Sequence, residues 1–240
     1  MSDEMDVQAI LRTARVLRVR ERIEQACARA GRPTDSVRLI AVTKYVSKEE
    51  TAELYKQGLR DMGENRWQVL KQKLVADLPV SWHFIGPLQT NKVKEVLRHV
   101  SYVHSLDRVK LADALASEAQ NAGISVRVLI QVNVTRESQK SGIAPEQIDG
   151  LLEHVLKQGE IEVAGLMTIG EQGADEHAAR STFARLRALR DRVEARFDIK
   201  LPELSMGMSA DFLWAIEEGA TMVRVGRELT GDGKNLQDSI

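Results

Sequence analysis

The sequence has one cysteine, Cys27, and only five prolines among its 240 residues. A single cysteine can form neither an internal disulfide nor a CxxC site, which is typical of a protein in a reducing compartment. The prolines and glycines are nowhere gathered into a linker that would separate two domains. We therefore expect one domain that spans residues 1–240.

An excess of charge of either sign is also missing, since 34 lysines and arginines face 35 aspartates and glutamates. The formal net charge of -1 offers no overall field that would attract nucleic acid or an anionic membrane. All apolar runs fall short of the ~20 residues that cross a bilayer. The acidic start, MSDEMDVQ, also differs from a secretory signal. The sequence therefore predicts a cytoplasmic protein with neither nucleic acid nor a membrane as partner.

A glycine-rich dinucleotide fingerprint is absent after the first apolar, β-branched segment. Eight such segments alternate with helical patterns, and each but the last precedes a clear helix. Eight βα units predict a single (β/α)8 barrel of the TIM type. A doubly wound open sheet is the alternative, which the missing fingerprint disfavours. The predicted strands are 37–44, 60–63, 81–86, 101–105, 126–134, 163–169, 203–208 and 220–225.

A further helix is predicted ahead of the barrel, over residues 7–30. Its apolar residues recur at helical spacing, and Gly31 with Pro33 just beyond marks its end. Because the stretch after Gly231 is short and polar, this helix can cover the place where an eighth helix would lie. We therefore expect a barrel over 37–231 with an extra amino-terminal helix.

The first predicted strand ends on a lysine, Lys44. Ligands of α/β barrels bind at the carboxyl ends of the strands, where the loops gather around one opening. A lysine that is partly desolvated there has a lowered pKa and can present a free amine for Schiff-base chemistry. The alternative is a solvated lysine that merely opens a loop.

A second candidate region is the stretch 204–231, where strand seven leads to Ser209 and strand eight leads to Gly226. Helix N-termini and glycines let backbone N–H groups approach an anion, and the loops after strands seven and eight are the usual phosphate site of barrels. A plain serine cap and a plain glycine turn explain the same residues equally well.

The five histidines show no spacing that suggests a metal site. His83 lies near the end of the third predicted strand, where it either packs at the barrel mouth or acts as a base. The others, His99, His104, His154 and His177, are scattered along the sequence, so we expect no metal ion.

Five segments together resemble the YggS/PROSC family of pyridoxal phosphate homeostasis proteins. They are AVTKY, MGENRWQ, WHFIGPLQTNK, GLMTIG and SMGMSADFLWAIEEGATMVRVGRELTG. The resemblance covers almost the whole chain, and the segments come in order at the ends of predicted strands. That family is similar to the barrel half of bacterial alanine racemases, a fold-type III architecture. The resemblance implies pyridoxal 5'-phosphate as cofactor, linked as an aldimine to Lys44.

The resemblance also implies roles for five other residues. It places Ser209 and the backbone around Gly226 and Arg227 at the phosphate, and Asn65 beside the ring or the Schiff base. It places Arg224 against the pyridine nitrogen. An arginine does not give up its proton, so the ring nitrogen stays largely unprotonated and the cofactor is a poorer electron sink.

Two functional classes follow from the resemblance, a cofactor-binding protein and an enzyme. Racemisation needs proton transfer on both faces of the cofactor. The sequence ends soon after strand eight, so we expect it to lack the second domain from which racemases place a tyrosine base. We therefore predict a monomeric protein of vitamin B6 homeostasis with no catalytic residues, whose partners are pyridoxal phosphate and apo pyridoxal-phosphate enzymes. A single-domain amino-acid racemase is the alternative.

Overall fold

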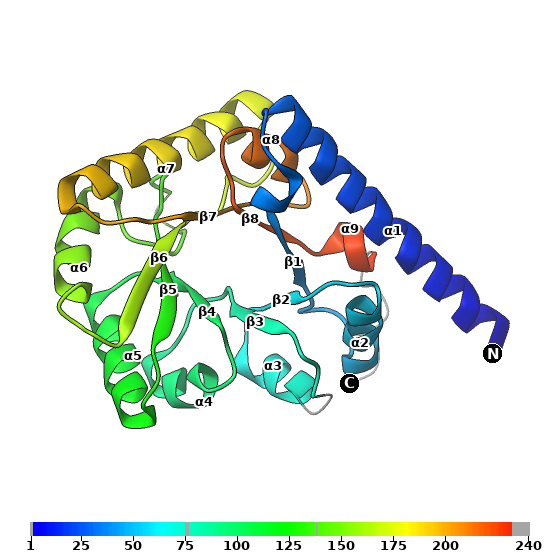
Figure 1. Ribbon diagram of the computed structural model, residues 1–240, viewed down its shortest axis with the longest axis horizontal. Helices are drawn as coiled ribbons and strands as arrows, with labels where there is room; N and C mark the ends of the chain where they lie inside the picture. Colours follow the sequence, from blue (N-terminus) through cyan, green and yellow to red (C-terminus); the bar gives the residue numbers. More distant parts are fainter. Residues whose placement is uncertain (1, 75–76, 138, 232–240) are drawn as a thin grey trace.

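The computed structural model describes residues 2–74, 77–137 and 139–231. Eight parallel strands follow one another around a closed barrel, and β8 returns to pair with β1. The predicted (β/α)8 barrel is thus confirmed, as Figure 1 shows. The strands are β1 (Arg38–Val42), β2 (Asp61–Glu64), β3 (Ser81–Phe84), β4 (Tyr102–Leu106), β5 (Val126–Gln131), β6 (Ile161–Met167), β7 (Glu203–Met208) and β8 (Met222–Val225).

Helices surround the strands on the outside of the barrel (Figure 1). Their apolar faces pack against the outward side chains of the strands in one large core. The α-helices are α1 (Ser2–Arg29), α2 (Lys48–Lys56), α3 (Trp67–Leu74), α4 (Val93–Leu97), α5 (Val109–Ala122), α6 (Ile148–Val155), α7 (Glu176–Phe197), α8 (Phe212–Glu217) and α9 (Arg227–Thr230). Short 3-10 helices precede β1, α4 and α6 at Thr34–Ser36, Thr90–Lys92 and Pro145–Gln147.

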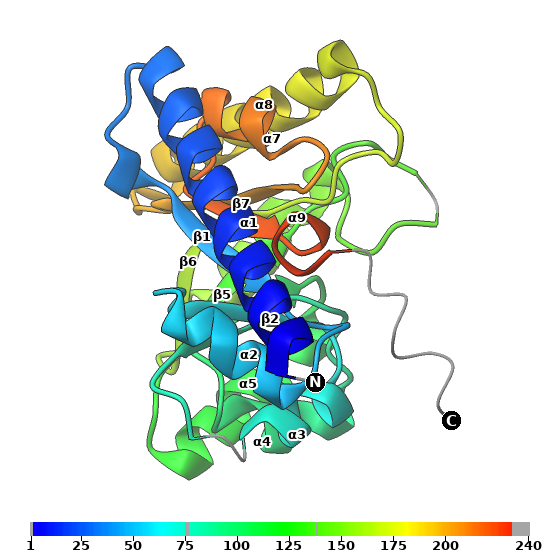
Figure 2. The same ribbon diagram turned by 90° about the vertical axis from the view of Figure 1, so that its right-hand side faces the viewer.

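Helix α1 lies along α8 and α9 and crosses the side of the barrel toward α2, as Figures 1 and 2 show. The last strand is followed by α9, which the sequence did not predict and which has only four residues. Because α9 is so short, α1 packs against α8 and α9 on this side of the barrel and takes the place of a full eighth helix, as expected. The buried face of α1 includes Val16, Val19 and Ile23.

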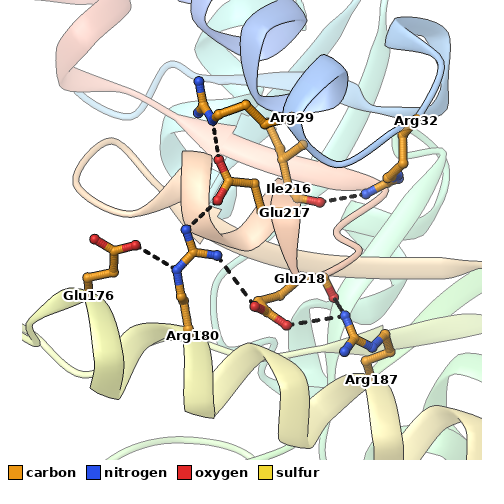
Figure 3. A network of polar contacts seen from close by, with 8 residues as sticks. All are labelled: Arg29, Arg32, Glu176, Arg180, Arg187, Ile216, Glu217 and Glu218. Carbon is orange, nitrogen blue, oxygen red and sulfur yellow. Dashed lines mark hydrogen bonds and ion pairs between the residues drawn. The ribbon is translucent and has the colours of Figure 1, made fainter.

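Helix α8 is clamped between α1 and α7 by a polar network (Figure 3). Arg29 of α1 donates from Nε to Glu217 at 2.6 Å, and Arg180 of α7 pairs with the same carboxylate from the other side. Arg32 adds a hydrogen bond to the carbonyl oxygen of Ile216 at 2.8 Å. Because β7 leads directly into α8, this clamp also holds the turn that carries Ser209.

The interior of the barrel is partly polar. Its apolar cluster consists of Ile40, Tyr102, Leu129, Ala164, Met167 and Met222. Four polar side chains are buried beside this cluster, and they are His83, His104, Ser205 and Arg224. A barrel interior that contains charge and imidazole groups loses hydrophobic stabilisation, so these side chains must be paired with one another.

Several predicted strand bounds need correction. Strand β3 ends at Phe84 rather than at 86, β5 ends at Gln131 rather than at 134, and β6 spans Ile161–Met167 rather than 163–169. The first strand ends at Val42, two residues before Lys44, because the N–H of Val46 donates to the carbonyl oxygen of Thr43 and closes a turn. The eighth strand begins at Met222 rather than at 220. Apolar patterning does not mark these boundaries, because turn hydrogen bonds set them.

Candidate functional site

The residues predicted to bind a cofactor lie at the carboxyl ends of four neighbouring strands. Lys44 and Asn65 follow β1 and β2, Ser209 follows β7, and Gly226 and Arg227 follow β8. Their strands are adjacent in the order β7, β8, β1, β2, so these residues share one part of the barrel mouth. Ser209 and Gly226 are in direct contact, since the N–H of Gly226 donates to the Ser209 Oγ at 3.3 Å.

Lys44 occupies the turn of residues 43–46, between β1 and α2. The turn is followed by a capping box, in which the Ser47 side chain accepts from the Glu50 N–H and the Glu50 carboxylate accepts from the Ser47 N–H. The Lys44 side chain is half-buried, and its Nζ lies 4.7 Å from the ring centroid of the exposed Tyr45. The backbone of this lysine is therefore fixed, while its amine lies at the rim of the barrel.

A buried ion pair anchors the residue just before Lys44. Lys73 of α3 donates to the carbonyl oxygen of Thr43 and to the carboxylate of Glu64. The Thr43 hydroxyl donates to the same carboxylate oxygen at 2.5 Å. Burial lowers the pKa of Lys73, and the charge of Glu64 opposes this shift. The pair was missed at the sequence level, although a lysine three residues after the buried Leu70 on one helix face was a visible signal.

Asn65, which follows β2, has an unsatisfied acceptor. Its Oδ1 is buried and has no hydrogen-bond partner among the described residues. Gly86 makes this placement possible, because a Cβ at Gly86 would lie 2.3 Å from the carbonyl oxygen of Asn65. A buried amide oxygen without a partner costs about 1–3 kcal/mol, so a ligand that donates a hydrogen bond there would recover part of that cost.

Arg224 is a buried cation within β8. It is 4% exposed, and it donates to the Ser205 Oγ at 2.5 Å and to the carbonyl oxygen of Thr168 at 2.8 Å. Burial lowers the pKa of Arg224 to about 10, while the carboxylate of Asp211 opposes the shift. The guanidinium therefore stays charged at neutral pH and acts only as a hydrogen-bond donor.

The turn from β7 into α8 depends on a glycine with a left-handed backbone. Gly207 has φ of 90°, and a Cβ there would lie 2.6 Å from the Cβ of Ala215 and 2.9 Å from the Cα of Phe212. Only glycine allows this approach. The close approach brings Ser209 beside Gly226, and Arg227 next to them is exposed.

Of the two interpretations of His83, the structure supports packing, since the ring is fully buried. His104, which seemed unrelated to it in the sequence, lies 2.9 Å away, measured from His83 Nδ1 to His104 Nε2. Within the described residues, no three His, Cys, Asp or Glu side chains converge as metal ligands. None of the helices described is both long and apolar enough to span a membrane.

Comparisons with known proteins identify relatives over most of the chain. The family model for the alanine racemase N-terminal domain matches residues 16–234. The pyridoxal phosphate homeostasis protein of Aquifex aeolicus is 46% identical over 222 residues, which cover 92% of this chain and 97% of that protein. The protein of the same name from Pseudomonas aeruginosa is 44% identical over 219 residues, covering 90% and 93%.

A solved structure gives the same result at the level of the fold. PipY of Synechococcus elongatus, whose structure was determined with PLP bound, superposes with a TM-score of 0.77 at 34% identity, covering 89% of this chain and 100% of PipY. The barrel and its site thus define a protein of the alanine racemase N-terminal domain class. Within that class, the chain belongs to the family of pyridoxal phosphate homeostasis proteins.

Proposed function

We propose that this chain binds pyridoxal 5'-phosphate through Lys44 and serves the homeostasis of that cofactor without substantial turnover. The observation that carries the proposal is that three polar groups come from the adjoining strands β8, β1 and β2. They are a buried guanidinium, a lysine amine and an amide oxygen without a partner among the described residues. The names of the Aquifex and Pseudomonas relatives and the PLP-bound structure of PipY support it.

The chain offers a partner for each part of such a cofactor, which supplies an aldehyde and an electron-accepting pyridine ring. The Lys44 amine would hold the aldehyde carbon of the cofactor. The Ser209 hydroxyl and the backbone N–H groups at Gly226 and Arg227 would hold the phosphate, because the turns after β7 and β8 touch through the hydrogen bond between Gly226 and Ser209. The Asn65 Oδ1, which has no partner among the described residues, would accept a hydrogen bond from a polar group near that aldehyde.

The charge of Arg224 supports a binding role for this protein rather than an enzymatic one. Since the pKa of Arg224 is about 10, it keeps its proton at neutral pH and could only donate a hydrogen bond to the ring nitrogen of a bound cofactor. An unprotonated ring withdraws electrons weakly. It therefore does little to speed the loss of the α-proton from a bound amino acid. We propose a cytoplasmic monomer that passes the cofactor to apo pyridoxal-phosphate enzymes.

The first test is chemical trapping at Lys44. Borohydride reduction of the protein loaded with pyridoxal phosphate should fix the cofactor on the peptide that contains Lys44, as read by mass mapping. Lys44→Ala should lose the near-visible absorption band of the Schiff base. The matched control is Lys48→Ala, a nearby exposed lysine, which should keep both signals. A label found only on another lysine would contradict the assignment.

The second test separates a carrier from a racemase, the alternative that family membership raises. Exchange of the α-hydrogen of L- and D-alanine in deuterated water should be no faster with loaded protein than with free pyridoxal phosphate. The physical reason is the weak electron sink beside Arg224. Fast exchange on both enantiomers that disappears in Lys44→Ala would establish an enzyme instead.

A further inference from the structure

Five polar side chains form a continuous hydrogen-bonded chain through the barrel interior. Asp61 Oδ1 lies 2.9 Å from His83 Nε2, and His83 Nδ1 lies 2.9 Å from His104 Nε2. The chain continues from His104 Nδ1 to the Ser205 Oγ at 2.9 Å and from there to Arg224 Nη1 at 2.5 Å. These residues come from β2, β3, β4, β7 and β8, so the chain links strands on different sides of the barrel.

The two ends of the chain determine its direction. A guanidinium can only donate and an ionised carboxylate can only accept. Arg224 therefore donates to Ser205, and Asp61 accepts from His83. Each neutral imidazole has one donor and one acceptor nitrogen, so both rings must carry their proton on Nε2, and the Ser205 hydroxyl must donate to His104. With neutral rings, every bond of the chain then runs from the arginine to the carboxylate.

The surroundings keep both rings neutral. Burial lowers the pKa of His83, although Asp61 opposes the shift. Burial also lowers the pKa of His104 strongly, and the charges of Arg224 and Arg38 act in the same direction. Two further features face the pair. The Tyr102 ring stacks on His83 with centroids 5.0 Å apart. Arg38 lies between two carboxylates, 3.8 Å from Asp61 and 3.6 Å from the Glu203 carboxylate.

We propose that His83, His104 and Ser205 are positioning residues that orient Arg224 toward the ring nitrogen of the bound cofactor. The inference rests on the proposed function. A serine hydroxyl is a rotor that can present either its hydrogen or its lone pairs to a neighbour. His104 accepts the hydroxyl hydrogen, so the lone pairs of Ser205 face Arg224. Together with the Thr168 carbonyl, they hold two N–H groups of the guanidinium fork in fixed directions.

A first experiment determines the protonation of the two histidines of the hydrogen-bonded chain, in protein without added cofactor. Nitrogen NMR of the histidine rings at pH 8 should show His83 and His104 as neutral rings with the proton on Nε2. In Ser205→Ala the His104 Nδ1 loses its donor, so its resonance should shift. A proton on Nδ1 of either ring in the wild-type protein would overturn the inference.

A second experiment tests whether the chain acts on the ring nitrogen. Affinities are measured for pyridoxal phosphate and for its analogue with a C–H group in place of the ring nitrogen. The wild-type protein should prefer pyridoxal phosphate. Ser205→Ala and His104→Leu should reduce this preference about tenfold, the factor for one charge-assisted hydrogen bond. General damage to the barrel would instead weaken the binding of both compounds alike.

Two control variants make the result specific. His104→Gln keeps one donor and one acceptor and should retain part of the preference that His104→Leu loses. Ser105→Ala removes a buried hydroxyl from the same strand and should keep the wild-type preference, because Ser105 lies outside the chain. If the wild-type protein binds neither compound, the proposed function is wrong. If wild-type protein, Ser205→Ala and His104→Leu all prefer pyridoxal phosphate over the analogue to the same extent, the proposed positioning role of the hydrogen-bonded chain is wrong. The proposed function then still holds.

Discussion

Gly86 and Gly226, at the mouth of the barrel, differ in the space that surrounds them for a side chain. A Cβ at Gly86 would lie 2.3 Å from the Asn65 carbonyl oxygen and 2.8 Å from its Cα. A Cβ at Gly226 would instead lie 3.4 Å from Val42, an ordinary contact distance. Gly86 is therefore required by the fold, whereas Gly226 has room for a methyl group and its glycine is better explained by the approach of a ligand.

We predict that Gly86→Ala and Gly226→Ala separate stability from binding. Gly86→Ala must displace Asn65 and should lower the free energy of unfolding by about 1–3 kcal/mol, the usual cost of overpacking. Gly226→Ala should leave stability nearly unchanged and weaken the binding of pyridoxal phosphate. Urea unfolding and a dialysis titration measure the two effects. Equal stability losses in both variants would refute this division.

The site residues that could be predicted from the sequence are those next to strand ends. Lys44, Asn65 and Ser209 follow apolar segments directly, and a barrel brings all such ends to one mouth. The chain from His83 to Ser205 could not be predicted in this way. His104 and Ser205 are 101 residues apart, and only the closure of the barrel brings them together.

At the scale of elements, α1 shows what apolar spacing does and does not determine. The sequence predicted this helix and its place beside the barrel, but four of its apolar residues are exposed, namely Val7, Ile10, Leu11 and Leu17. Contacts with α8 and α9 determine which face of α1 is buried. Arg22 of α1 pairs with Glu228 of α9 and lies 4.8 Å from the Phe212 ring of α8. Periodicity alone carries no information about such partners.

The clamp on α8 also explains why short helices are stable here. An isolated helix of six residues would not form in water, since nucleation costs more than its few hydrogen bonds return. Arg29 and Arg180 both bind Glu217, which is 15% exposed, and this partial burial makes the network stronger than a solvated ion pair. Tertiary contacts rather than helix propensity thus hold the Ser209 turn in place.

At the scale of the whole molecule, the two ends of the barrel differ. The predicted site residues gather at the carboxyl ends of the strands, which is where sequence reasoning expected them. A pocket of about 330 Å³ lies at the opposite end, between α1 and the starts of β1 and β2, and Asp61 and Arg38 are among its lining residues. Asp61 also begins the hydrogen-bonded chain to Arg224, so the polar interior connects the two ends.

This buried interior should make the stability of the protein depend on pH between 6.5 and 5. Both His83 and His104 have a pKa below the ordinary value of 6.5 in the folded protein. The unfolded chain therefore binds more protons than the folded one in this range. The free energy of unfolding is then highest above pH 6.5 and falls as the pH falls, by at most about 1.4 kcal/mol per pH unit for each histidine.

Urea unfolding at a series of pH values measures this slope, and the window above pH 5 keeps most carboxylate titrations out of it. The groups that face the pair are Asp61, Arg38, Glu203, Tyr102 and Arg224, and none of them has an ordinary pKa inside the window. His104→Gln should therefore flatten the curve by removing one buried imidazole, while His177→Gln, which removes an exposed one, should keep the wild-type slope. A wild-type stability that stays constant from pH 8 to pH 5 would show that the interior accepts protons as readily as water does, and that the histidines are not held neutral by burial.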